Sequence, residues 1–99
     1  MKMIKVYLNV GIDEEFLRLL KSLGVDEYIK IPKAVGKLKG LEPMEDTHIW
    51  PGYFVIYEIP SDEKKVKKLV KSIREFADKY RDEGVCIIIQ DIECVEERR

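Results

Sequence analysis

The residues best suited to do chemistry gather in one short segment, "EDTHIWPGY", at positions 45–53. It holds the only histidine of the 99-residue chain, His48, and its only tryptophan, Trp50. Imidazole and carboxylate groups together form a ligand set for a transition metal, so His48, Glu45 and Asp46 are candidate metal ligands. The amphipathic ring of Trp50 suits the wall of a ligand site or a surface that contacts a partner.

A purely structural alternative stays open for the same segment. Pro51 and Gly52 are typical turn residues and supply the dihedral preferences that a turn needs. His48 would then only hydrogen-bond this turn, and Trp50 would only cover it. With one histidine per chain, a metal site would also need ligands brought together by symmetry between copies.

A second candidate site is "VGKLKG" at positions 35–40, where Lys37 and Lys39 stand between Gly36 and Gly40. Glycine lets the backbone approach a ligand closely, and two ammonium groups can neutralise an anion such as phosphate. The spacing of a phosphate-binding P-loop is absent, and a solvated basic turn is the alternative. No nucleophile stands beside a recognisable base anywhere in the chain, so we expect a protein that is not an enzyme.

Composition limits the class of protein. With 45% apolar residues, the 99 residues suffice for a single domain, 1–99. The 18 Lys and Arg nearly cancel the 19 Asp and Glu, which argues against a nucleic-acid partner. No apolar run approaches the roughly 20 residues of a membrane span, so we expect a soluble, cytoplasmic protein. Cys86 and Cys94 are interpreted as reduced core residues of the last strand, too far apart to bridge.

The hydrophobic period switches five times along the chain and predicts six elements. They are a strand at 3–10, a helix at 12–24, strands at 27–36 and 53–60, a helix at 61–80 and a strand at 84–95. Pro32 indicates an edge or a bulge in the second strand, and Ser61 is the expected N-cap of the second helix. A long loop, 36–52, and a polar tail, 96–99, complete the chain.

This βαββαβ order predicts an α+β, ferredoxin-like fold, in which two helices cover one face of a four-stranded antiparallel sheet. The third and last strands are apolar on both faces at their centres, as Phe54 and Ile56 show on one side and Val55 and Tyr57 on the other. A sheet with one solvated face should alternate apolar with polar residues. We therefore expect the second face to pack against other subunits.

The second predicted helix carries a basic face opposite its apolar stripe. Its lysines are Lys64, Lys65, Lys67, Lys68 and Lys71. We interpret this run as the solvated side of an amphipathic helix.

Taken together, the βαββαβ order, "VGKLKG" at the end of the second strand, the long loop and "VIYEIPSDEKKVKKLVKSIREF" resemble the PII-type nitrogen regulatory proteins and their PII-like relatives over residues 3–95. The resemblance implies a homotrimer whose sheets face its axis. It also implies that the loop is the family's mobile T-loop, which contacts target proteins and responds to ligands bound between subunits. The candidate ligand-binding residues are then Gly36, Lys37, Lys39, Trp50 and Gly84.

The sequence also departs from the PII pattern. "YRDEGVC" stands where the family has a glycine-rich phosphate loop, and the acidic Asp82 and Glu83 beside Gly84 repel phosphate. The tyrosine-bearing modification motif of the T-loop is missing. We therefore expect weak ATP binding and no uridylylation, and the sequence names no cofactor.

The function predicted from the sequence is a PII-like signalling protein, in which a small molecule or ion bound at the inter-subunit clefts biases the mobile loop. The alternative is a CutA-type divalent-metal-binding or tolerance protein, which shares the fold and the trimer and would use His48. An RNA-recognition module is disfavoured, because its aromatic motif is absent and the chain is not basic.

Overall fold

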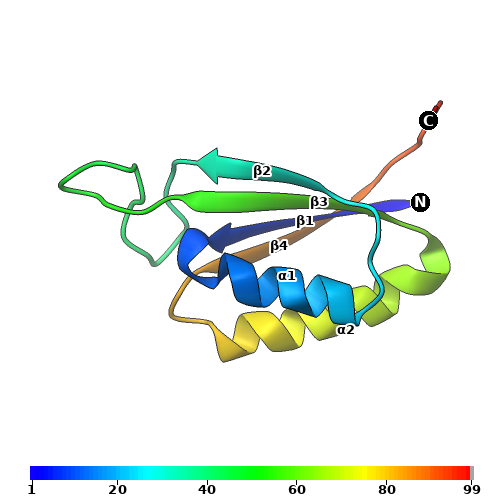
Figure 1. The fold of residues 1–99 in the computed structure, drawn as a ribbon, viewed down its shortest axis with the longest axis horizontal. Helices are drawn as coiled ribbons and strands as arrows, with labels where there is room; N and C mark the ends of the chain where they lie inside the picture. The colour runs from blue at the N-terminus through cyan, green and yellow to red at the C-terminus, as the bar shows by residue number, and fades with distance from the viewer. Residues whose placement is uncertain (99) are drawn as a thin grey trace.

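The structure is a computed structural model that describes residues 1–98 of the chain. Its elements are β1 (Lys2–Asn9), a 3-10 turn η1 (Val10–Ile12), α1 (Asp13–Ser22), β2 (Ile29–Ala34), β3 (Phe54–Ser61), α2 (Glu63–Lys79) and β4 (Val85–Asp91). The strands form one antiparallel sheet in the order β2-β3-β1-β4. Both helices lie on the same face of this sheet (Figure 1). The predicted α+β, ferredoxin-like fold is confirmed, and β2 and β4 are its edge strands.

The core lies between the sheet and the helices. Its buried side chains come from the inner face of the sheet and from the apolar stripes of both helices: Ile4, Val6, Leu8, Ile12, Phe16, Leu20, Val55, Tyr57, Ile59, Val66, Leu69, Ile73 and Phe76. The ring of Phe16 joins the layers, with its centroid 4.9 Å from that of Tyr57 and 5.3 Å from that of Phe76. Because each fully buried side chain of this size contributes roughly 1.5–3 kcal/mol, this layer holds the fold together.

Both helices begin and end where the sequence chemistry favours it, with one correction. Gly24 ends the first helix with a φ of +73°, as its position predicted. The N-cap of α2 is Asp62, whose carboxylate accepts hydrogen bonds from the backbone N–H groups of Lys64 and Lys65. The prediction of Ser61 as the N-cap is wrong, because Ser61 still pairs with Lys2 in the sheet and is buried there.

The last strand is shorter than its pattern predicted. It ends at Asp91, which pairs with Lys2, the first residue of β1, and a single backbone hydrogen bond from Ile92 to Met1 follows this pair. Cys86 therefore lies in the sheet and is partly buried, whereas Cys94 lies beyond the strand and is exposed. The interpretation of Cys94 as a core residue of the strand is wrong.

The edge strand β2 is irregular, as Pro32 indicated. Its pairing with β3 shifts register between Ile31 and Ala34, on either side of this proline. Proline lacks the N–H that a regular ladder would use, so the shift falls where a donor is missing. None of the described helices is both long and apolar enough to cross a membrane.

The face of the sheet away from the helices is apolar over much of its width. The register places Tyr7, Phe54, Ile56, Cys86 and Ile88 on this open face, together with Ile29 and Ile31 of the edge strand. Phe54 is buried beneath the loop that follows β2, but Ile29 is 63% exposed. The chain alone therefore leaves an apolar surface, interrupted by the ion pair between Lys5 and Glu58, in contact with solvent.

Candidate functional site

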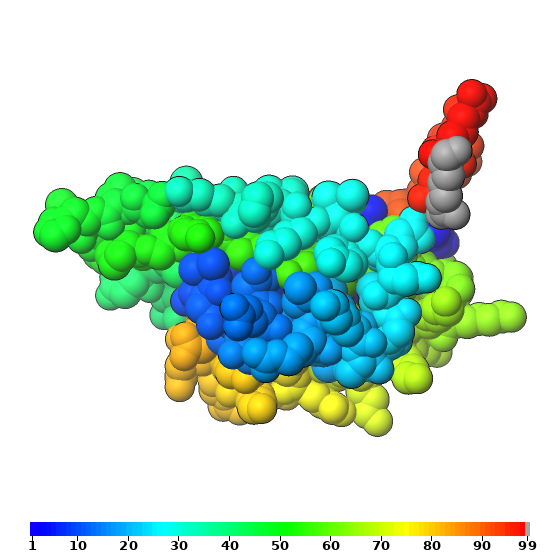
Figure 2. Space-filling model, in the orientation of Figure 1, coloured from blue at the N-terminus to red at the C-terminus, as the bar shows by residue number. Residues whose placement is uncertain are grey.

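The long connection between β2 and β3 has two structurally different parts. The loop base, residues 35–44, is closed by a short antiparallel bridge in which Gly36 and Met44 exchange two backbone hydrogen bonds of 2.8 Å each. The loop tip, residues 45–52, projects beyond the sheet and forms one end of the molecule (Figures 1 and 2). The predicted site residues divide between these two parts.

The loop base packs against the turn between α2 and β4. A methyl group added at Gly84 would lie 2.8 Å from Cδ1 of Leu41 and 4.0 Å from Cδ1 of Leu38. Gly84 has a φ of +92°, and its carbonyl accepts a hydrogen bond of 3.2 Å from the N–H of Asn9 at the end of β1. The backbone conformation therefore favours glycine here, and the side-chain end of Leu41 lies close to it.

This packing brings together four of the five predicted ligand-binding residues. Gly36, Lys37 and Lys39 all lie on the loop base, which rests on Gly84 through its leucines. Both lysine side chains are exposed. The loop base and the α2–β4 turn thus form one continuous surface that carries two ammonium groups.

A small hollow opens where the loop base meets the open face of the sheet. Tyr7, Phe54 and Ile56 contribute the side that belongs to the sheet, and residues 34–38 contribute the other side. Its volume is about 230 Å³, which is below the range of about 300–1,000 Å³ that is usual for ligand pockets. The hollow in one chain therefore suits either a very small ligand or a site that a neighbouring subunit completes.

The loop tip is held mainly by hydrogen bonds within itself. The carbonyl of Trp50 accepts from the N–H groups of Glu45 and Thr47 at 3.1 and 3.0 Å, and the Thr47 hydroxyl accepts from the N–H of Trp50 at 2.9 Å. The N–H of Asp46 donates to the carbonyl of Gly52 at 2.8 Å. An ion pair between Asp46 and Lys33 ties the tip to β2. The hydrogen bond to Asp46 raises the pKa of Lys33 above its ordinary value.

The three predicted metal ligands lie together in sequence on this tip, and all are exposed. Asp46 adopts a φ of +54° and already pairs with Lys33, while Glu45 and His48 face solvent. Among residues 1–98, no three His, Cys, Asp or Glu side chains lie close enough to hold an ion. A metal site at His48 therefore stays a prediction that would need ligands from another copy.

Trp50 does not join the residues of the loop base. Its backbone hydrogen bonds stay within the tip, and its side chain is 38% exposed beside Ile49, which is 77% exposed. The pair forms an apolar patch at the end of the projection. This position suits contact with a partner better than contact with a ligand held at Gly84.

Sequence reasoning missed the residues that shape the loop base. Leu38 and Leu41 contact the position of Gly84, and Met44 places its sulfur 3.3 Å from where a methyl group at Gly52 would lie. The available signal was a set of apolar residues, spaced three apart, in residues 36–44, which otherwise consist of glycine, proline and charged residues.

No protein-family model and no curated protein sequence matches this chain. Its structure, however, is similar to that of CPII, a nitrogen regulatory PII-like protein from Thiomonas intermedia K12. Against CPII bound to ADP and bicarbonate, the TM-score is 0.72 at 19% identity, over 92% of this chain and 84% of CPII. Against CPII bound to ADP, AMP and bicarbonate, it is 0.71 at 17% identity, over 98% and 94%.

A PII-like signaling protein from Thermus thermophilus is also similar, with a TM-score of 0.63 at 13% identity, over 90% of this chain and 83% of that protein. The chain therefore has the fold of the PII-like nitrogen regulatory proteins. The resemblance found in the sequence is confirmed at the level of the fold.

Proposed function

We propose that this chain is a PII-like regulatory protein that binds a small anion at the loop base and acts on a partner through the loop tip. We further propose that it works in the cytoplasm as a homotrimer and as a binding protein rather than an enzyme. The observation that carries the proposal is the packing of the loop base, with Lys37 and Lys39, onto Gly84.

The charges around this surface favour a compact anion. Lys37 and Lys39 supply two exposed positive charges, whereas Asp82 and Glu83 precede Gly84 and carry negative charge. Acidic side chains beside the turn oppose a polyphosphate, which would extend toward them. CPII, which has the same fold, has been seen with ADP, AMP and bicarbonate. We accordingly expect bicarbonate or a nucleotide with few phosphates to bind better than ATP.

Assembly into a trimer is supported by the open face of the sheet. Apolar side chains such as Ile29 and Ile31 are exposed there, and burying apolar surface contributes about 25 cal/mol per Å². A neighbouring subunit on this face would also complete the walls of the small hollow at the loop base.

Switching requires that the ligand bind two loop conformations with different affinity. The loop offers a physical route, because its base contacts the body of the protein while its tip is tied to it by few contacts. A ligand held at the base that also contacts the first residues of the tip would favour one orientation of the tip, and so change how the tip presents Ile49 and Trp50 to a partner.

The decisive experiment combines subunit counting with binding. Native mass spectrometry should report a trimer, and calorimetry should detect bicarbonate or AMP binding that is stronger than ATP binding. Changing Lys37 and Lys39 together to alanine should weaken this binding at least about tenfold, which corresponds to about 1.4 kcal/mol. The matched control changes Lys64 and Lys65, two exposed lysines of α2, and should bind normally.

A stable monomer at micromolar concentration would overturn the assembly. Equal losses from both double variants would mean that general positive charge, and not the loop base, attracts the anion. Tight ATP binding that is lost on changing Gly84 would overturn the preference for a compact anion.

A further inference from the structure

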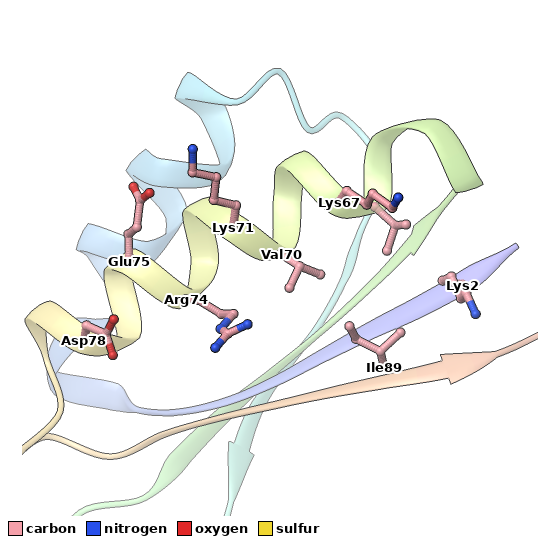
Figure 3. Close-up of a pocket in the computed structure, with 9 residues that line it drawn as sticks. Lys2, Lys67, Val70, Lys71, Arg74, Glu75, Asp78 and Ile89 are labelled. Atoms are coloured by element: carbon pink, nitrogen blue, oxygen red, sulfur yellow. The ribbon is translucent and has the colours of Figure 1, made fainter.

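A second and larger hollow lies on the other side of the molecule, between α2 and the edge strand β4. Its volume is about 590 Å³. Figure 3 shows Val70 and Arg74 pointing from α2 toward β4, and Ile89 pointing back from the strand. We refer to this hollow as the α2–β4 groove.

The groove combines an apolar floor with a charged rim of four basic and two acidic side chains. Val66, Val70 and Ile89 form the floor, and Ile89 is 45% exposed. The charged lining consists of Lys2, Lys67, Lys71, Arg74, Glu75 and Asp78. Lys2 is neutralised by Asp91, whereas no ion pair engages Lys67, Lys71 or Arg74 within residues 1–98. The sequence suggested only a solvated helix face here, but two of its lysines border a groove.

Beside the groove, β4 has a free edge. In the sheet order this strand pairs only with β1, so its outer edge carries backbone N–H and C=O groups that have no strand partner in residues 1–98. An exposed strand edge beside an apolar groove is a template for an added strand.

The segment after β4 carries side chains that complement those of the α2–β4 groove. Residues 92–98 follow β4 and extend away from the body of the protein (Figures 1 and 2). The hydrogen bond of 3.1 Å from the N–H of Ile92 to the carbonyl of Met1 lies at the start of the segment, and Val95 farther along is 89% exposed. In an extended segment Glu93, Val95 and Glu97 share one face. That face places an apolar side chain between two carboxylates.

We propose that the tail of one copy, residues 92–98, docks in the α2–β4 groove of a second copy as a strand added to the free edge of β4. Val95 would lie on the apolar floor, and the flanking carboxylates would face Lys67, Lys71 and Arg74.

The length of the extended tail agrees with the length of the groove along α2. The six residue steps of the tail span about 20 Å when extended, and the twelve residue steps from Val66 to Asp78 span about 18 Å along α2.

A second copy is the occupant because a chain's own tail points away from its own groove. To return along β4, the chain would have to reverse direction directly after Asp91. Residues 92–97, "IECVEE", contain no glycine, proline, asparagine, aspartate or serine to form such a turn. Tail docking does not depend on ligand binding at the loop base, so either proposal can fail without the other.

The test is a disulfide that only two different chains can form. In chains whose Cys86 and Cys94 are changed to serine, one copy carries Val70→Cys and a differently tagged, co-expressed copy carries Val95→Cys. Oxidation should give a cross-linked pair that contains both tags. The matched control replaces Val70→Cys by Lys68→Cys, which lies on the same helix but lines a different hollow.

We expect the cross-linked product to be several-fold more abundant with Val70→Cys than with Lys68→Cys. Absence of the product, or equal yields from both positions, would overturn the proposal and leave the groove open to a different partner.

A charge exchange tests the electrostatic part of the same contact, with the disulfide between Val70→Cys and Val95→Cys as its readout. Lys71→Glu together with Arg74→Glu should abolish the cross-link, and Glu93→Lys together with Glu97→Lys on the other chain should restore it. Loss without restoration, in chains that remain folded by circular dichroism, would show that these charges do not meet.

Discussion

The two parts of the long loop differ in what holds them. The loop base is packed onto the body of the protein, through Leu38 and Leu41 at Gly84 and through the bridge between Gly36 and Met44. The loop tip relies on hydrogen bonds among its own residues and on a surface ion pair, and its apolar side chains face solvent. The base is therefore part of the folded body of the protein, whereas the tip projects from it with its apolar side chains exposed.

This difference suggests that the base and the tip of the loop have different functions. A ligand site gains affinity when its walls are already in place, because less conformational entropy is lost on binding. A surface that adapts to a partner gains from weak restraint, since it can be reoriented at small cost. The comparison predicts that changes in the base alter stability and ligand binding, and that changes in the tip alter partner contacts alone.

The largest expected effect comes from filling the space between the base and the body. Gly84→Ala forces an L-residue to a φ of +92° and places a methyl group 2.8 Å from Leu41. We expect it to lower the free energy of unfolding by about 2–3 kcal/mol, mostly from backbone strain, with a smaller part from the displacement of the Leu41 side-chain end. Chemical denaturation monitored by circular dichroism measures this.

The matched control is Gly40→Ala. Gly40 has a similar φ of +80°, but no atom lies within 4 Å of the added methyl group. Gly40→Ala should lower the free energy of unfolding by about 1–2 kcal/mol, from backbone strain alone. Equal losses at the two positions would show that the loop base does not press on Gly84, and the comparison between base and tip would fail.

Truncating one side chain in each part should change stability by a smaller amount, and by different amounts in the base and in the tip. Leu41 is partly buried against the body, so Leu41→Ala should cost about 1 kcal/mol, less than the roughly 2–5 kcal/mol of a fully buried leucine. Ile49 on the tip is 77% exposed, so Ile49→Ala should leave the unfolding midpoint unchanged. A substantial loss of stability at Ile49 would mean that the tip is packed in solution, for example against another subunit.

Sequence reasoning recovered the fold because the signals for it are local and redundant. The alternation of Ile4, Val6 and Leu8 sets the inner face of β1, and the spacing of the apolar residues in 66–76 sets that of α2. The predicted ends of helices and strands were less accurate than their existence and order. Ser61 was misassigned, because whether a residue pairs with another strand depends on residues far away in the chain.

The site was only partly predictable for the same reason. Gly36, Lys37 and Lys39 are neighbours in sequence, so their grouping was visible, and the PII resemblance suggested Gly84. That Leu41 is the side chain pressing on Gly84 was not predictable, since 43 positions separate them and no pattern marks such a pair. Trp50 lies in the same loop as the lysines, yet its backbone hydrogen bonds hold it on the loop tip, with Glu45 and Thr47.

The smallest expected effect concerns the ion pair that ties the tip to β2. Lys33→Gln removes the cation that pairs with Asp46, while the side chain keeps much of its length. Because both side chains are exposed, the pair should contribute little to global stability, and the unfolding midpoint should not move. The local consequence should nevertheless be measurable. Hydrogen exchange at the amides of Asp46 and Thr47, which hold the tip together, should become faster, whereas exchange at Gly36 and Met44 in the base should not change.

Salt provides the internal control for this prediction. The Debye length falls from about 10 Å at 0.1 M to about 3 Å at 1 M ionic strength, so high salt should weaken the pair in the unmodified protein and reduce its difference from Lys33→Gln. Faster exchange in the base as well would mean that the two parts of the loop open together. Their separate restraint, and with it the distinct roles proposed for base and tip, would then be wrong. Faster exchange confined to the tip would instead support a base that stays in place while the tip moves.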